Sequence, residues 1–277
     1  MIRLLQIEFI KLWNNRASKV LILSYFVLLT SIALVAAIKF DIGPIKFHLA
    51  EQGIFNFPYI WHFNTFITAF FKLFLAIVIV SMMANEYSNK TIKQNLIDGL
   101  SKKEFILSKF LTVLTFAAIS TIFVFVVSLI LGLAYSDYNE FSIIFSDLEF
   151  LLAFFVKLVG FFSFCLFLGI LVKRSAFALG FLFLWQILEG IVRGLIRWKL
   201  LDGTGTDFVM GFFPLNSMFN LIKEPFTRLS AVQNVANQVG ESFKLDYHVY
   251  FHEVLIVMVW TGIFIYGSYA LLKKRDL

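Results

Sequence analysis

The sequence predicts an all-α integral membrane protein. We expect six transmembrane helices, an N-terminal amphipathic interfacial helix, a cytosolic helix between the second and third spans, and an outer re-entrant segment. Hydrophobic residues make up 60% of the 277 residues and charged residues only 15%, against about 45–50% and 25% in soluble domains. The apolar residues form runs of membrane-spanning length, and basic residues gather at alternate ends of those runs. These observations indicate a single membrane domain covering residues 1–277.

Six apolar runs justify the six spans, because a helix needs about 20 mostly apolar residues to cross the hydrocarbon core of a bilayer. The expected spans are 20–38, 58–83, 110–133, 151–172, 176–194 and 249–272. The first run is longer than the apolar part of a signal peptide, about 7–15 residues, so we interpret it as a retained span. The single cysteine, Cys165, allows no intrachain disulfide.

The distribution of basic residues predicts the orientation. Six spans place both termini on one side, and the positive-inside rule identifies that side as the cytoplasm. Segments 1–19, 85–109, 173–174 and 273–277 are rich in Lys and Arg, whereas the only charges of loop 134–150 are acidic. We therefore expect a multi-pass protein of the bacterial inner (plasma) membrane with both termini cytoplasmic. The net charge of +6 follows this topology and does not indicate binding of nucleic acid.

Residues 1–19 have the pattern of an amphipathic helix lying on the inner leaflet. Arg3 and Lys11 lie opposite an apolar face with i, i+3, i+4, i+7 spacing, made of Ile2, Leu5, Phe9, Leu12 and Trp13. Such a helix rests in the interface, with its basic residues at the anionic lipid surface. The alternative is a basic leader that only orients the first span.

The interlude between the second and third spans, residues 85–109, predicts a short helix, a tight turn and a second helix. Ile92, Leu96 and Ile97 lie on one face of the short helix, and Gly99 follows its last turn, where a left-handed C-cap favours glycine. Ser101 and Glu104 form a capping box, which opens a helix that continues into the third span. This degree of order exceeds that of an ordinary solvated loop.

The outer loop 198–248 contains an apolar run, Phe208–Ile222, that is broken by Pro214 and is too short to cross the membrane. We interpret it as a re-entrant or interfacial element preceding the last span.

Ionisable residues within spans are candidates for a functional role, because burying charge in lipid costs at least about 2.5–3.5 kcal/mol. Lys72 lies near the middle of the second span. It either lines a pathway or pairs with an acid on another helix, or it sits at a subunit seam or snorkels. Lys157 lies nearer the outer end of its span and is expected to snorkel. Glu189 and Arg193, four residues apart, are expected to neutralise each other.

Residues His248 and His252 have the i, i+4 spacing of zinc ligands, but the sequence offers no third ligand. We therefore expect no metal site.

Taken together, these segments resemble the ABC-type-2 permease family, the membrane subunits of bacterial ABC exporters, whose fold is also found in ABCG-like transporters. The loop after the second span in that family carries an acidic residue, a Thr, a Leu, and a Ser followed by a basic residue. The matching positions here are Glu86, Thr91, Leu96, Ser101 and Lys102. Lys90 stands where the family usually has Gly before the Thr, and the Pro that usually precedes the Ser region is absent.

The resemblance implies that the interlude is a coupling helix that docks in a groove of a separate ATPase subunit. The residues implied in this contact or in its shape are Glu86, Thr91, Ile92, Leu96, Ile97, Gly99, Ser101, Lys102 and Glu104. The sequence agrees independently, because it has no Gly-x-x-x-x-Gly-Lys-Ser/Thr loop to bind phosphates. We expect no cofactor and no enzymatic activity in this chain, with ATP and Mg²⁺ bound by the partner.

The expected function is that of a permease subunit of an ATP-driven exporter, which pairs with itself or with a sister permease and works by alternating access. Two alternatives stay open. A membrane-embedded lipid-modifying enzyme would need an essential polar cluster and no ATPase, and a gradient-driven carrier would show internal repeats and broken midplane helices.

Overall fold

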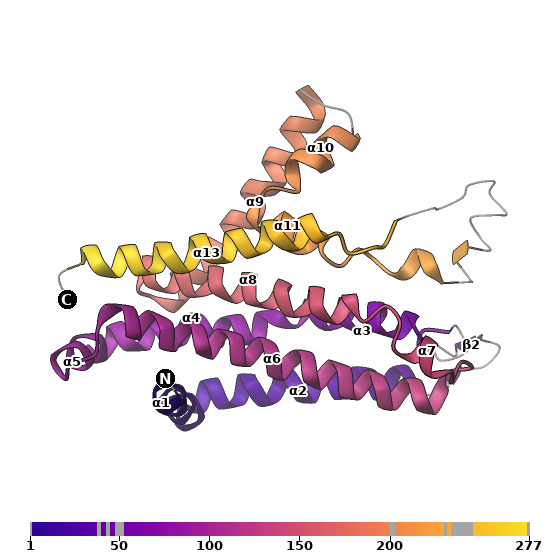
Figure 1. Ribbon diagram of the computed structural model, residues 1–277, viewed down its shortest axis with the longest axis horizontal. Coiled ribbons are helices and arrows are strands. Elements are labelled where there is room, and N and C mark those ends of the chain that lie inside the picture. Colours follow the sequence, from indigo (N-terminus) through magenta and orange to yellow (C-terminus); the bar gives the residue numbers. More distant parts are fainter. Residues whose placement is uncertain are drawn as a thin grey trace.

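The computed structural model describes residues 2–37, 40–42, 45–47, 53–199, 203–229, 232–233 and 246–275. The fold is a helical bundle with one short hairpin (Figure 1). Its elements are α1 (Ile2–Asn14), α2 (Arg16–Ala37), β1 (Phe40–Ile42), β2 (Ile45–Phe47), α3 (Tyr59–Phe70), α4 (Lys72–Ser88), α5 (Thr91–Ile97), α6 (Lys102–Tyr135), α7 (Phe141–Ile144), α8 (Glu149–Val172), α9 (Ser175–Lys199), α10 (Gly203–Met210), α11 (Pro214–Asn220), the 3₁₀ helix η2 (Phe226–Arg228) and α13 (Phe251–Lys274). Strands β1 and β2 pair antiparallel, with Asp41 opposite Lys46.

Within the described residues, five helices are long and apolar enough to cross a membrane, or six if the bent pair α3 and α4 is one span. This is the pattern of a multi-pass membrane protein. Each expected span falls on one of these helices or on the bent pair. The predicted end of the first span at Ile38 and most of the stretch 230–245 of the outer loop lie outside the described residues.

The second span is broken near its middle. Helices α3 and α4 meet at Phe71 with a bend of 45°, and Lys72 is the first residue of α4. The bend divides this span into α3 and a second half, α4, that leads to α5.

Helix α8 lies at the centre of the bundle and contacts α3, α4, α6, α9 and α13. A side chain at Gly160 would place its Cβ only 2.7 Å from the Cγ1 atom of Val257 on α13. Glycine at this position therefore lets α8 and α13 pack closely, as small residues do between membrane helices.

The two ends of the described chain lie at the same end of the bundle, next to α5, and α1 runs across the direction of α2 (Figure 1). Helices α9 and α10 project together from the side of the bundle. Helix α11 begins with Pro214 at its first turn and returns to pack against α8, α9 and α13.

Candidate functional site

Helix α5 is held in shape at both ends, as the sequence predicts. Gly99 follows the helix with a φ of +97°, which is the left-handed conformation that glycine adopts without strain. The capping box that opens α6 is present: the Glu104 amide donates to Ser101 Oγ at 3.2 Å, and the Ser101 amide donates to Glu104 Oε2 at 3.0 Å. Helix α6 then continues without a break for 34 residues. The α5–α6 corner is therefore a rigid unit.

The apolar face of α5 is turned mainly toward the protein itself. Ile92 is only 2% exposed, and Leu96 packs against the hydrophobic core. Ile97 is 75% exposed. The expectation that Ile92, Leu96 and Ile97 form one docking face is therefore wrong for Ile92, whose burial anchors this two-turn helix on the bundle. Leu96 is half-buried, and Ile97 is the most exposed apolar side chain of α5.

A buried ion cluster lies directly beneath α5 and joins three helices that are distant in sequence. Lys109 of α6 is fully buried, and its Nζ lies 2.6 Å from Glu8 Oε2 of α1 and 2.6 Å from Glu86 Oε1 of α4. Lys11 of α1 lies on the open side of the cluster, with its Nζ 3.0 Å from Glu86 Oε1 and 3.4 Å from Glu8 Oε1. We call these four residues the base cluster.

Thr91 connects the base cluster to α5. Its hydroxyl donates to the Glu86 carboxylate and also lies 3.3 Å from the Glu86 carbonyl oxygen. Thr91 is the first residue of α5, so Glu86 is bonded both to the start of α5 and to Lys109 in α6. A displacement of α5 thus reaches α4 and α6 through hydrogen-bonded contacts.

The base cluster is electrically balanced, with two carboxylates and two ammonium groups. Charges removed from water are tolerated only when paired with good geometry, and loss of one partner costs about 3–5 kcal/mol. Lys11 illustrates the balance, because partial burial lowers its pKa but the carboxylates of Glu8 and Glu86 outweigh burial and raise the pKa above the ordinary 10.5. The paired charges of the base cluster therefore hold α1, α4 and α6 together at this end of the bundle.

A polar cavity of about 210 Å³ opens beside the base cluster, between α1, the end of α4 and the start of α5. Its lining includes Lys11, Asn15, Asn85, Asn89 and Thr91. Lys11, whose side chain is 40% exposed, lies on this open side of the cluster.

The C-terminal tail closes the same end of the bundle. Arg275 donates to the carbonyl oxygens of Ile170 and Leu171, which end α8, and its Nη1 lies 3.1 Å from the hydroxyl of Tyr87. Lys102 donates to the carbonyl of Arg275 at 3.0 Å. Helices α4, α6, α8 and α13 are therefore cross-linked at the end that carries α5.

The two lysines within the spans differ from each other in environment. Lys72 Nζ lies 4.4 Å from the centroid of the Phe161 ring on α8, a cation–π contact, and no acid pairs with it within the described part of the chain. Lys157 is 2% exposed and donates to the carbonyl of Phe219, near the end of α11, at 3.3 Å. The expectation that Lys157 snorkels is therefore wrong, because the negative end of α11 supplies a partner inside the bundle.

Glu189 and Arg193 do not pair with each other, contrary to expectation. Glu189 is 5% exposed and accepts from the backbone amides of Leu215 and Asn216 at 3.0 and 2.8 Å. These amides open α11, so Glu189 caps that helix. Arg193 instead forms an ion pair with Asp207 of α10. Sequence spacing missed both contacts because α10 and α11 fold back onto α9.

The opposite end of the bundle has its own polar group. His62 Nε2 lies 2.9 Å from the carbonyl of Lys223, and Nδ1 lies 3.1 Å from Arg228 Nη1. The guanidinium of Arg228 lies over the rings of both Tyr59 and Tyr247. These contacts fix η2 of the outer loop on α3.

At the same end of the bundle, His248 Nδ1 lies 3.6 Å from Glu149 Oε1, and the His252 ring lies 5.4 Å from that of Tyr250. No group of three or more metal-binding side chains is found among the described residues.

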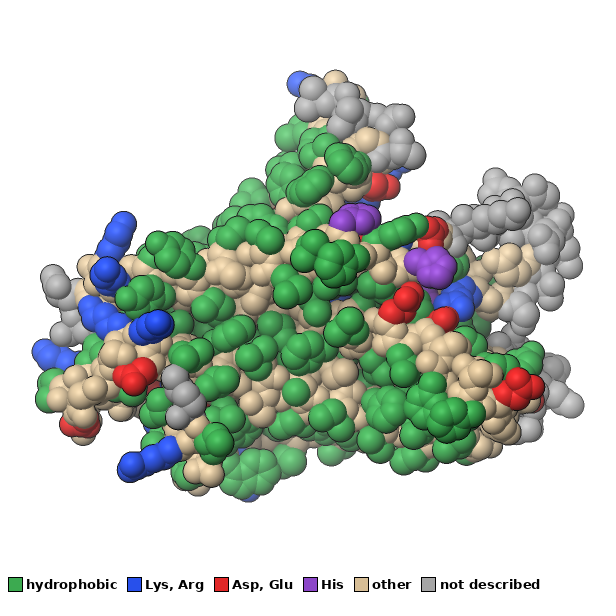
Figure 2. All heavy atoms as spheres, viewed as in Figure 1, with side chains coloured by type: hydrophobic (Ala, Val, Ile, Leu, Met, Phe, Trp, Pro, Cys, Tyr) green, Lys and Arg blue, Asp and Glu red, His purple; other side chains and the backbone are tan. Residues whose placement is uncertain are grey.

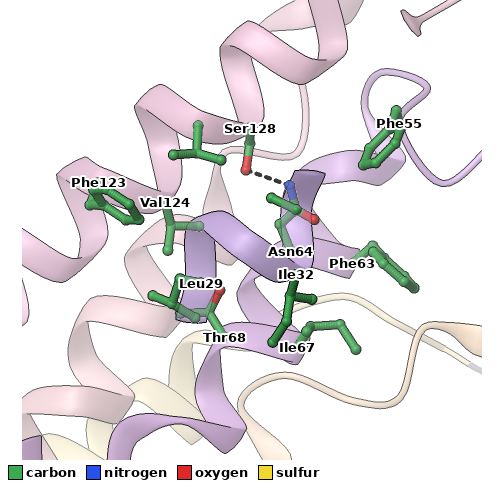
Figure 3. A pocket seen from close by; sticks show the side chains of 12 residues that line it. Leu29, Ile32, Phe55, Phe63, Asn64, Ile67, Thr68, Phe123, Val124 and Ser128 are labelled. Carbon is green, nitrogen blue, oxygen red and sulfur yellow. Dashed lines mark hydrogen bonds between the residues drawn. The ribbon is translucent and has the colours of Figure 1, made fainter. Parts of the chain in front are cut away.

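A small cavity lies between α2, α3 and α6 (Figure 3). Asn64 Nδ2 donates to Ser128 Oγ across it at 2.8 Å, and the other lining residues are mostly apolar. Its volume of about 50 Å³ is far below the 300–1,000 Å³ or so of ligand pockets. This cavity is too small to hold a ligand of ordinary size.

Comparison with known proteins gives one match. Residues 27–277 match the family described as "Protein of unknown function (DUF2705)". The chain belongs to the DUF2705 family. A search of curated proteins found no match. The part that matches DUF2705 includes Glu86, Thr91 and Lys109, whereas Glu8 and Lys11 of α1 precede it.

The sequence identified Glu86 of the base cluster and Thr91, which binds it, as candidate site residues of this DUF2705 chain, but not the other three members of the cluster. Glu8 had a readable signal, because it is the only acid in a basic segment and lies four residues before Leu12. These two residues are the buried ones of α1, whereas Ile2 and Trp13 of the expected apolar face are 76% and 53% exposed. Lys109, a lone cation at the start of a long apolar run, was the second signal.

Proposed function

We propose that this chain is the membrane-spanning permease subunit of an ATP-driven exporter and that α5 is the element through which a separate ATPase subunit moves it. The observation that carries the proposal is the bonding of α5 to the buried base cluster through Thr91 and Glu86. A solvated loop needs no such joint. An element that is moved by a partner needs such a connection, because its displacement must be transmitted to the transmembrane helices.

Lys90 supports the resemblance on which this proposal rests. Its φ of 56° is left-handed, a conformation that costs a non-glycine residue about 1–2 kcal/mol. The ABC-type-2 permease family usually has Gly at this position, before the Thr. The backbone geometry that such a glycine would serve is therefore kept here by a lysine.

In the proposed mechanism, closure of two ATPase subunits pushes on the exposed side of α5, around Ile97 and Lys93. The capped α5–α6 corner passes the push to α6, and the Glu86–Lys109 contact passes it to α4. The 45° break at Phe71 lets α4 swing while α3 stays attached to the outer loop through His62 and Arg228. Two permeases, identical or sister chains, would surround the pathway and open it alternately to each side.

The direct test is Ile97→Asp. Burial of a large aliphatic side chain contributes about 1.5–3 kcal/mol, so copurification of the ATPase subunit should weaken roughly tenfold to hundredfold. Ile97→Leu, which keeps an apolar side chain at the same place, is the matched control. The fold should be unaffected by either change because Ile97 packs against little of the protein.

Two results would overturn the proposal. One is an Ile97→Asp protein that keeps its ATPase partner and its ATP-dependent transport. The other is a wild-type protein that copurifies with no ATPase and transports under an ion gradient alone. That result would favour the gradient-driven carrier, for which a broken helix such as the bent pair α3 and α4 is also expected.

The proposed orientation has a separate test. A topology reporter fused after Leu277 should report the cytoplasm, and one inserted within 138–147 should report the outside. The reverse pattern would contradict the orientation and with it the docking of a cytosolic ATPase on α5.

A further inference from the structure

A groove of about 530 Å³ runs between the first turns of α6 and the last turns of α13. Its walls are apolar, with Ile106, Leu107 and Phe110 on α6 facing Ile265 and Tyr269 on α13. This volume lies within the 300–1,000 Å³ or so of ligand-binding sites. It is distinct from the base cluster, whose cavity lies between α1, α4 and α5.

The groove is long enough to cover most of the thickness of one leaflet of a bilayer. From Lys103 to Phe110 along α6 is about 10 Å, and from Thr261 to Tyr269 along α13 is about 12 Å, at about 1.5 Å per residue. The hydrocarbon core of one leaflet is about 15 Å thick. The groove therefore extends from the end of the bundle to near the membrane midplane.

The floor of the groove is open where α13 carries Gly262. A Cβ atom at Gly262 would meet no atom within 4 Å, so this glycine is not required by close helix packing. By contrast, a Cβ atom at Gly267, five residues further along α13, would lie only 3.1 Å from the ring of Phe167. The groove is thus open beside Gly262, and a larger side chain there would project into free space along its lining.

The rim of the groove is positively charged. Lys103 lines it, and the Lys102 ammonium holds the end of α13 close by, through the carbonyls of Lys273 and Arg275 at 3.3 and 3.0 Å. Lys273 and Lys274 are exposed at the same end. Figure 2 shows Lys and Arg side chains at this end of the molecule and apolar side chains along its middle.

We propose that this groove binds one anionic phospholipid of the cytoplasmic leaflet, with an acyl chain along the apolar walls and the phosphate at Lys103. Basic pockets between transmembrane helices on the cytoplasmic side are suited to anionic headgroups. A cation at the rim of an apolar groove that covers most of one leaflet is complementary to such a lipid at both ends. The inference rests on the proposed orientation and is independent of ATPase docking.

The test uses the purified full-length protein in neutral detergent, titrated with phosphatidylglycerol or phosphatidylcholine and followed by native mass spectrometry. A lysine near the surface contributes about 1 kcal/mol toward an anionic lipid, so phosphatidylglycerol should bind roughly fivefold more tightly than phosphatidylcholine. Lys103→Gln should remove most of that preference. Arg174→Gln, which removes an exposed cation from the α8–α9 turn, is the charge control and should retain it.

Filling the groove tests the apolar part of the site. Gly262→Phe should reduce the binding of both lipids, whereas Gly180→Phe on α9, where a Cβ also meets no atom within 4 Å, should not. If Gly262→Phe does not fold, Gly262→Leu and the Lys103→Gln titration carry the test.

Equal binding of both lipids to the wild type, or unchanged binding to Gly262→Phe, would overturn the inference. The inference would also be overturned if the wild type were a dimer and Gly262→Phe dissociated the dimer without changing lipid binding. In that case a second copy of the chain, and not a lipid, would occupy the groove. The ATPase copurification assay is unaffected by any of these outcomes, so failure here is distinguishable from failure of the proposed function.

Discussion

Replacement of Lys109 by methionine tests the base cluster most directly. Methionine fills a similar volume but leaves Glu8 and Glu86 buried with only Lys11, whose side chain is 40% exposed, to balance them. The cluster then carries a net charge of −1 instead of zero. Loss of one partner of a buried pair costs about 3–5 kcal/mol, and a destabilisation of 1 kcal/mol lowers the Tm of large domains by about 2–4 °C. We expect Lys109→Met to lower the Tm by roughly 6–20 °C.

The five tryptophans of the chain allow thermal unfolding in detergent to be followed by intrinsic fluorescence. Lys93→Met, which removes an exposed lysine of α5, is the matched control and should change the Tm little. The double variant Lys109→Met/Glu86→Gln restores neutrality and should recover part of the loss, because Glu8 and Lys11 still pair. A Tm for Lys109→Met that equals that of the control, or a double variant less stable than the sum of its single changes, would refute the reasoning.

Three further predictions concern other contacts. Glu189→Ala should destabilise the protein by about 1.5–3 kcal/mol, because it removes charge-assisted hydrogen bonds from buried backbone amides. Arg193→Met should cost less than about 1 kcal/mol, because its ion pair with Asp207 is exposed. Equal losses of stability in chemical denaturation would argue that Glu189 and Arg193 pair with each other. Lys90→Gly should raise stability by up to about 1 kcal/mol by relieving a left-handed backbone, and a lowered Tm would contradict this. Lys11→Met should have a lower Tm than the wild type at pH values below 10.5, where Lys11 is charged in both the folded and the unfolded chain. This Tm difference should disappear as the pH rises through the raised pKa of Lys11 in the folded protein. A Tm difference that persists above that pKa would exclude an ionic role for Lys11.

The helices of the bundle were predictable because each depends on a local pattern. The capping box of Ser101 and Glu104 and the glycine cap at Gly99 are read from residues within four positions of each other. Likewise, an apolar run of about 20 residues can only be buried in a bilayer or in a core. Even the break in the second span had a local sign, since Lys72 interrupts an otherwise apolar run.

The partners of charged residues were not predictable from the sequence, because they are chosen by helix packing. Glu189 and Arg193 are four residues apart and could have paired, yet the return of α10 and α11 offered each a better partner. Lys157 is buried for the same reason, since the end of α11 arrives beside it. The direction of the α5 face was missed because a periodic pattern identifies a face but not what covers it.

The base cluster also sets an order of events during synthesis of the chain. Glu8 and Lys109 are 101 residues apart, so at about 5–20 residues per second Glu8 is made roughly 5–20 s before its buried partner. During that interval α1 has no place in the bundle to occupy. The exposed side chains of Ile2, Ile10 and Trp13 can hold α1 at the membrane surface until α6 has been synthesised. Helix α1 is therefore made well before α6 and can complete the base cluster only after Lys109 of α6 has been made.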